Sequence, residues 1–253
     1  MSLHDAMIKS GHTLFRYRSY LPLLIIGPLI VALKEGVRIE NLVGDDIEDI
    51  WVLFCFILSL CGLALRGFTV GTVPAGTSGR NANTQRADHL NVTGMYSVVR
   101  NPLYLGNFII ILGVLLSIKV WWLVLLGGLA FFIYMERIVL AEEKFLTEKY
   151  GQTYLDWRAK TPVIIPDFKL WEKAALPFSL RTVLRREYPG LLNIGLAFYI
   201  TEMFADVLFE HEPFGEWLVE DKAWSITMGV IIVICMTLRF LKKKTNLLKV
   251  EGR

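Results

Sequence analysis

The sequence predicts an all-α membrane protein, a polytopic bundle of about six transmembrane helices. Of its 253 residues, 54% are hydrophobic, which exceeds the share in an ordinary soluble domain. The apolar residues also gather in blocks between polar segments, as in a chain that crosses a membrane several times. The basic residues gather in alternate polar segments, which is the third observation that favours this fold class.

Each predicted crossing is one apolar block. The six blocks are Tyr20–Leu33, Ile50–Leu65, Leu103–Ile118, Val120–Met135, Gly190–Phe209 and Ala223–Leu241. Several are shorter than the ~20 residues that span the hydrocarbon core, so flanking residues complete them or the bilayer thins locally. Gly27-Pro28 interrupts the first block, and no clean cleavage site follows it, which favours an uncleaved helix over a signal peptide. The third and fourth blocks are predicted to form a tight antiparallel hairpin.

The distribution of charge predicts the orientation. With the N-terminus in the cytoplasm, all of the 27 Lys and Arg residues lie on the cytoplasmic side except Lys34, Arg38, Lys119 and Lys222. This bias is typical of membrane proteins, and it predicts an integral protein of the cell inner membrane with both termini in the cytoplasm. The formal net charge of +3 is too small to indicate a nucleic-acid partner.

The chain divides into three predicted regions. Residues 1–87 hold two crossings and a cytoplasmic loop, residues 88–166 form the core with the hairpin, and residues 167–253 hold an interfacial segment and two crossings. Helix formers from Glu136 to Tyr154 extend the fourth crossing into the cytoplasm. The stretch Trp171–Tyr188 fits a helix lying on an anionic leaflet, or else a plain connector.

Several kinds of chemistry have no support in the sequence. Cys55, Cys61 and Cys235 lie in apolar blocks without a CxxC pattern, and the four His residues are dispersed. Disulfides, metal sites and hydrolase triads are therefore not expected, and no metal is predicted as a partner.

The first polar motif lies where the third crossing begins. It comprises Thr93–Tyr96 and Arg100–Gly106. Pro102 suits a first helical position, with Asn101 as its N-cap, so the motif is partly explained as a helix start. Arg100 serves equally well as an interfacial anchor or as a functional residue. A helix start does not require Tyr96 and Tyr104, which lie at the same boundary.

The second motif follows the fourth crossing. It comprises Glu142-Glu143, Tyr150-Gly151, Tyr154, Pro162 and Pro166. An acidic pair is commonly a solvated helix surface, but it also suits a cationic or ribose-bearing ligand. Because the two motifs flank one hairpin, they predict a cofactor site at the water–bilayer boundary. Glu202 and Asp206, four apart at membrane depth, are either functional or hydrogen-bonded between helices.

These motifs resemble the signature of the isoprenylcysteine carboxyl methyltransferase and phospholipid methyltransferase superfamily of integral membrane enzymes. The resemblance covers about Asp88–Pro166, a third of the chain. It implies an S-adenosylmethionine-dependent methyltransferase. The cofactor-binding residues that it implies are His89, Leu90, Asn91, Tyr96, Asn101, Pro102, Leu103, Tyr104 and Glu142.

Two positions depart from the family pattern. The family His is Asn101 here, which forms hydrogen bonds but does not titrate near neutral pH. A family Arg four residues before the first Glu is replaced by Ile138, with Arg137 one residue earlier and therefore rotated by ~100° around the helix. A prenylcysteine substrate is thus less favoured than another lipid.

The sequence leaves three functions open. The favoured one is a methyltransferase acting on a lipid amine, carboxylate or phosphate at the inner leaflet, with Glu142, Arg137 and Arg100 as its catalytic residues. The alternatives are an NADPH-dependent lipid reductase and a non-catalytic scaffold of the same fold, the latter favoured by Asn101.

Overall fold

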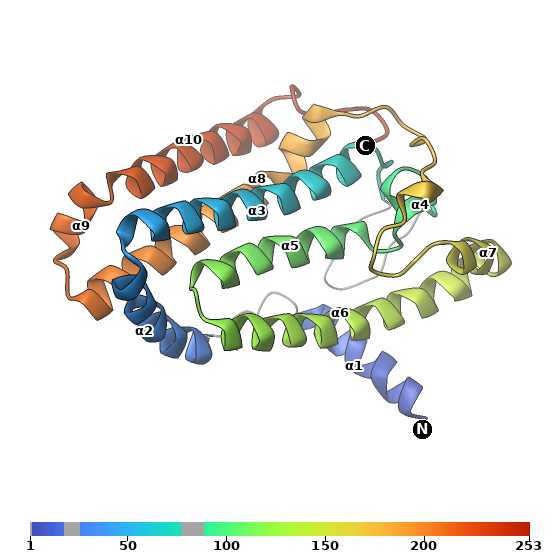
Figure 1. Cartoon of the computed structure of the whole chain (residues 1–253). Coiled ribbons are helices and arrows are strands. Elements are labelled where there is room, and N and C mark those ends of the chain that lie inside the picture. The colour runs from blue at the N-terminus through green and yellow to red at the C-terminus, as the bar shows by residue number, and fades with distance from the viewer. Residues whose placement is uncertain (1, 18–25, 77–88) are drawn as a thin grey trace.

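The computed structural model describes residues 2–17, 26–76 and 89–253, and within these ranges the chain is helical without strands. Long helices lie roughly antiparallel in a bundle, with short helices at its ends (Figure 1). The elements are α1 Leu3–Tyr17, α2 Ile26–Val43, α3 Asp45–Gly71, α4 Met95–Val98, α5 Pro102–Ser117, α6 Trp121–Tyr150, α7 Gln152–Lys160, the 3₁₀ turn η2 Phe168–Leu170, α8 Leu180–Ala205, the π-helical turn η3 Asp206–Glu210, α9 Phe214–Glu220 and α10 Lys222–Lys244.

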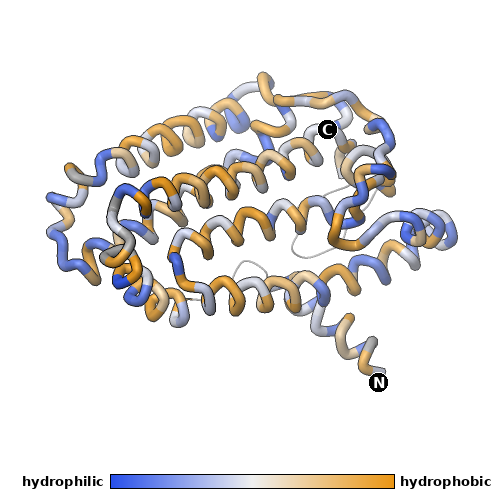
Figure 2. The backbone as a smooth tube through the Cα atoms, viewed as in Figure 1, coloured by the Kyte–Doolittle hydropathy of each residue, from blue (hydrophilic) through white to orange (hydrophobic). Residues whose placement is uncertain are grey.

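The predicted membrane bundle is confirmed. Four described helices are long and apolar enough to cross a membrane, namely α3, α6, α8 with η3, and α10, and α5 is a shorter apolar helix. Hydrophobic residues run along these helices, whereas hydrophilic residues gather at the two ends of the bundle (Figure 2). The protein is therefore a polytopic membrane helix bundle.

The first predicted crossing needs correction. Its residues 20–25 lie outside the described ranges, and its remainder opens α2, which continues ten residues past Leu33 to Val43. The continuation carries Lys34, Glu35 and Arg38, so α2 is not among the apolar helices long enough to span. The sequence prediction ended this crossing at Leu33 because the charged residues that follow are typical of a loop.

The interfacial helix considered for Trp171–Tyr188 is also wrong. Apart from one bend, residues 171–179 are irregular, and residues 180–188 are the first turns of α8. Ser179 caps that helix, since its hydroxyl accepts a hydrogen bond from the Thr182 amide at 3.3 Å. By contrast, the predicted extension of the fourth crossing is helical as far as Tyr150, where α6 ends before Gly151, whose φ is +53°. Tyr154 lies beyond this break, in α7.

Glycines allow α3 and α5 to pack closely along the centre of the bundle. A Cβ at Gly113 would lie 2.2 Å from Ser59 Oγ, and one at Gly62 would lie 2.7 Å from the carbonyl oxygen of Gly106. The helices touch through their backbones, as is common where small residues line a membrane interface. The α5 helix that carries the first motif is thus held against a rigid partner.

The α1 helix lies against the second half of α6. A Cβ at Gly11 would lie 2.0 Å from the carbonyl oxygen of Arg137 and 3.1 Å from the Ala141 side chain. Residues 137 and 141 are one helical turn apart, so they define the face of α6 that α1 covers.

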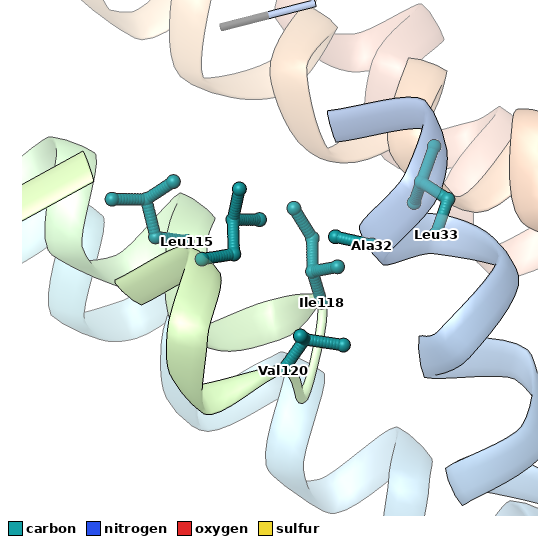
Figure 3. Packing of buried hydrophobic residues seen from close by; sticks show 6 residues of the cluster. Ala32, Leu33, Leu115, Ile118 and Val120 are labelled. Carbon is teal, nitrogen blue, oxygen red and sulfur yellow. The ribbon is translucent and has the colours of Figure 1, made fainter. Parts of the chain in front are cut away.

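The end of the bundle that holds the α5–α6 turn is called the hairpin end. Buried apolar side chains of α2 pack there against the turn, as Ala32 and Ile118 illustrate in Figure 3. Lys119, in the turn itself, has φ +66° and forms a 2.6 Å ion pair with the buried Glu48. The Trp122 indole donates to Glu35 at 2.8 Å. Each contact fixes the turn to α2 or α3.

Candidate functional site

The opposite end of the bundle, called the site end, holds α4 and α7 (Figure 1). Backbone hydrogen bonds bring the two motifs together there. The Arg100 amide donates to Pro162 O at 2.8 Å, and the Asp167 amide donates to Val98 O at 2.9 Å. The loop that follows α7 therefore runs beside the start of α5, and the indole of Trp157 in α7 donates to Tyr96 O at 3.1 Å.

Three of the predicted cofactor-binding residues lie together at this end. The Tyr104 hydroxyl donates to Glu142 Oε1 at 3.0 Å, which joins α5 to α6. The pKa of Tyr96 is raised, first by burial and then by the negative charge of Glu142, against the lowering influence of Arg186 and Arg66. Glu142 thus lies near two tyrosines, one of which it binds directly.

The neighbouring carboxylate, Glu143, is the ion-pairing residue of the site. It accepts from Arg100 Nη1 at 2.5 Å and lies 3.4 Å from Arg158 Nη2. Only 12% of each of the Arg100 and Glu143 side chains is exposed. Burial, and secondarily the charge of Glu143, raise the pKa of Tyr154 to about 12, so this tyrosine stays neutral beside the ion pair.

Asn101 and Pro102 begin α5 as predicted, but the cap itself differs from the prediction. Asn101 occupies the N-cap position without a side-chain capping bond. Its side-chain amide instead donates to Val163 O at 3.3 Å. Asn101 therefore connects α5 to the loop after α7, and Leu103 beside it is half-buried.

The remaining predicted site residues differ in their contacts and exposure. Arg137 contacts Glu136 at 3.8 Å, and its backbone faces α1, whereas the buried Ile138 shares a helical face with Glu142. His89 is exposed, and Leu90 and Asn91 are half-buried. Asp88, where the resemblance begins, lies outside the described residues.

Sequence reasoning missed a buried polar cluster between α3, α5 and α8. Arg66 donates through Nε and Nη2 to both oxygens of Glu187, at 2.9 and 3.1 Å, and through Nη1 to Asn107 Oδ1 at 2.8 Å. Glu187 is only 5% exposed. The sequence shows only that charged residues lie at the ends of apolar helices, and it does not show which of them pair. Arg158 was likewise not predicted, and Glu143 belonged to the second motif without being singled out from Glu142.

An open hollow of about 500 Å³ lies beside the Glu143 ion pairs. Its lining includes Arg100 and Arg158, together with Lys160, Thr161 and part of the loop from Pro162 to Leu170. Of the predicted site residues, only Arg100 lines it. The hollow is therefore distinct in composition from the group formed by Tyr96, Tyr104 and Glu142.

The acids predicted at membrane depth lie toward the hairpin end. Asp206 is buried and accepts a 2.7 Å hydrogen bond from the indole of Trp217. Carboxylate oxygens of Asp206, Glu212 and Asp221 lie within 4.8 Å of one another. These contacts join the end of α8 to the start of α10, far along the bundle from Glu142.

Comparison with known proteins yields two relatives and one family. Protein-S-isoprenylcysteine O-methyltransferase of Schizosaccharomyces pombe is 35% identical over 86 residues, which cover 34% of this chain and 36% of that protein. The nickel-cobalt-cadmium resistance protein NccN of Alcaligenes xylosoxydans xylosoxydans is 23% identical over 158 residues, or 62% of this chain and 68% of that protein. No solved structure shows significant similarity to the chain.

The family model described as phospholipid methyltransferase matches residues 72–153. The matched segment contains Tyr96, Tyr104 and Glu142, which the fold brings together at one end of the bundle. The chain spans about a third of the length of the S. pombe relative. This segment is therefore similar both to phospholipid methyltransferases and to the isoprenylcysteine methyltransferase of S. pombe, as its motifs predict.

Proposed function

We propose that the chain is a membrane methyltransferase that uses S-adenosylmethionine and methylates a lipid or lipid-linked acceptor. The observation that carries the proposal is the 3.0 Å contact between Tyr104 and Glu142, with Tyr96 in the field of the same carboxylate. This group lies at one end of the α5–α6 hairpin, within the segment that matches phospholipid methyltransferases.

The residues of this group fit the chemistry of the cofactor. S-adenosylmethionine supplies an electrophilic methyl group on a sulfonium cation, and it also carries ribose hydroxyls. A carboxylate and aromatic faces both attract a cation, and a carboxylate accepts hydrogen bonds from hydroxyls. Glu142, Tyr96 and Tyr104 would hold the cofactor, while Asn101 holds the loop after α7 against the start of α5.

In this proposal, catalysis comes mainly from positioning. Holding donor and acceptor close together in a dry site replaces a bimolecular encounter with an oriented one. Glu143 would act as a positioning residue, because its ion pair fixes Arg100 next to Asn101. Arg137, which the sequence predicts to be catalytic, does not share the face of α6 that carries Glu142. The positive-inside bias would place the site at the cytoplasmic leaflet.

Isothermal titration of the purified full chain with S-adenosylmethionine and its demethylated product tests the proposal. Glu142→Gln and Tyr104→Phe should each weaken binding about tenfold, since each removes part of a hydrogen bond to a charged group. Glu148→Gln, on an exposed turn of the same helix, is the matched control and should bind normally. Failure of the wild-type chain to bind either compound would refute the proposal, and binding of NADPH instead would favour the reductase.

A further inference from the structure

The hollow beside Glu143 has the charge of an anion site. Two arginines and a lysine line it, namely Arg100, Arg158 and Lys160, against one carboxylate in the lining, Asp167. The Asp167 carboxylate already accepts a 3.0 Å hydrogen bond from the Lys169 amide. Lys160 is exposed and forms no ion pair within the part of the chain that the structure describes. The lining is therefore net positive.

Arg100 lines the hollow from the side of the Glu143 ion pair. Its Nη1 is held by Glu143, and its Nε is buried without a hydrogen-bond acceptor among the described residues. Because the Nε atom has almost no accessible surface, an anion in the open hollow would instead meet Arg158 and Lys160, which are more exposed. The Arg100 guanidinium would add positive charge beside the anion.

The loop that lines the hollow also exposes apolar side chains. Ile165 is 80% exposed and Phe168 is 67% exposed. The loop is hydrogen-bonded through Pro162 and Asp167 to the two residues Arg100 and Val98, just before α5 begins. Since α5 is an apolar helix that begins beside this loop, the loop would lie near the depth where the hydrocarbon ends. Cations beside exposed apolar residues at that depth match a phospholipid, with its phosphate above its acyl chains.

We infer that the hollow binds the headgroup phosphate of an anionic membrane phospholipid. Arg158 and Lys160 would contact the phosphate, while Ile165 and Phe168 would lie against the acyl chains. Arg158 is also 3.4 Å from Glu143, so a bound lipid would contact the ion pair that holds the start of α5. This site requires only that the protein spans a membrane, and it does not depend on methyl transfer.

Native mass spectrometry of the detergent-purified full chain tests the inference. Phosphatidylglycerol and phosphatidylcholine with the same acyl chains would be titrated separately, and the lipid retained by the protein counted. Phosphatidylglycerol should be retained more strongly. Arg158→Gln and Lys160→Gln should each weaken its retention about fivefold, the worth of one basic residue near an anionic surface, and should leave phosphatidylcholine unaffected. Lys144→Gln, an exposed lysine on α6 outside the hollow, is the matched control.

Two further arms identify the source of the phosphate. Ile165→Ser combined with Phe168→Ser should weaken retention of both lipids, because both lose the same acyl contacts. Glycerol 1-phosphate, which has no acyl chain, should displace phosphatidylglycerol poorly. Equal retention of the two lipids by the wild type, or an equal loss in Lys144→Gln, would overturn the inference. Efficient displacement by glycerol 1-phosphate, with no effect of the serine substitutions, would overturn it in favour of a free phosphate ligand.

Discussion

The two ends of the bundle bury similar groups in different ways. At the hairpin end, Glu48 pairs with Lys119, and Glu35 accepts from Trp122. Each contact fixes the turn to one helix. At the site end, Glu143 faces two arginines, and the loop after α7 is tied to the start of α5 by backbone and side-chain hydrogen bonds. The comparison indicates that buried charge holds the fold at one end, and that at the other end it also lies beside an open hollow.

The largest expected effects come from breaking the ion pair at each end. Glu143→Gln and Glu48→Gln each leave a mostly buried cation without its carboxylate, so each should lower the free energy of unfolding by about 3 kcal/mol. Only Glu143→Gln should also weaken S-adenosylmethionine binding. Denaturation followed by titration of the folded fraction measures both effects. Equal loss of cofactor binding in Glu48→Gln would remove the distinction between the ends.

A substitution that disturbs the α3–α5 contact should destabilise both ends of the bundle alike. Gly113→Ala places a methyl group 2.2 Å from Ser59 Oγ and should destabilise the protein by about 1–3 kcal/mol, because neither helix can move away freely. Gly128→Ala is the control, since a Cβ there meets nothing within 4 Å and alanine favours the helix by up to about 1 kcal/mol. Thermal unfolding in detergent compares the two variants.

A smaller effect is expected from one neutral hydrogen bond at the site end. Asn101→Ala removes the bond to Val163 O and should cost about 1 kcal/mol of stability. It should also loosen the loop after α7, which hydrogen exchange at residues 162–167 would detect. Trp122→Phe removes a single hydrogen bond to Glu35 at the hairpin end, and should leave exchange in that loop unchanged.

The last effect, which is absent at neutral pH, is a dependence of stability on alkaline pH. The pKa of Tyr154 is about 12 in the folded protein against an ordinary value of 10.0. Its neutral form therefore stabilises the fold below pH 10, and this contribution is lost as the pH rises from 10 to 12. Tyr154→Phe should show a shallower decline over that window, measured as melting temperature against pH. An unchanged slope would mean that Tyr154 titrates normally.

The hairpin and its surroundings were predictable because the sequence patterns that mark them involve residues close together in the chain. Apolar blocks, Pro102 at a helix start and Gly151 at a helix end are read along the chain. The partners of charged residues are not local, since Arg66 and Glu187 are 121 positions apart. Adjacent carboxylates were equally hard to assign. Glu142 and Glu143 differ by ~100° around α6, so only the packing of α5 and α7 decides that one meets Tyr104 and the other meets two arginines.

The errors have physical causes as well. The α2 helix passes through Lys34, Glu35 and Arg38 because, at the end of the bundle, such side chains reach solvent or partners such as Trp122. Basic and apolar residues between 171 and 188 have the composition of an interfacial helix. Hydrogen bonds from Glu172 and Ala175 to residues 93–97 instead hold the first half of that segment in an irregular path.

Because α5 and α6 differ in length, the two helices of one hairpin would match the thickness of a membrane differently. At 1.5 Å per residue, the 16-residue α5 is about 24 Å long and the 30-residue α6 is about 45 Å long. A hydrocarbon core of about 30 Å therefore exceeds α5, while α6 extends past it. Because Arg100 contacts Glu143 directly, both side chains lie at one depth, and a bilayer would have to thin around α5 to keep them in the headgroups. Longer acyl chains would raise the cost of that thinning.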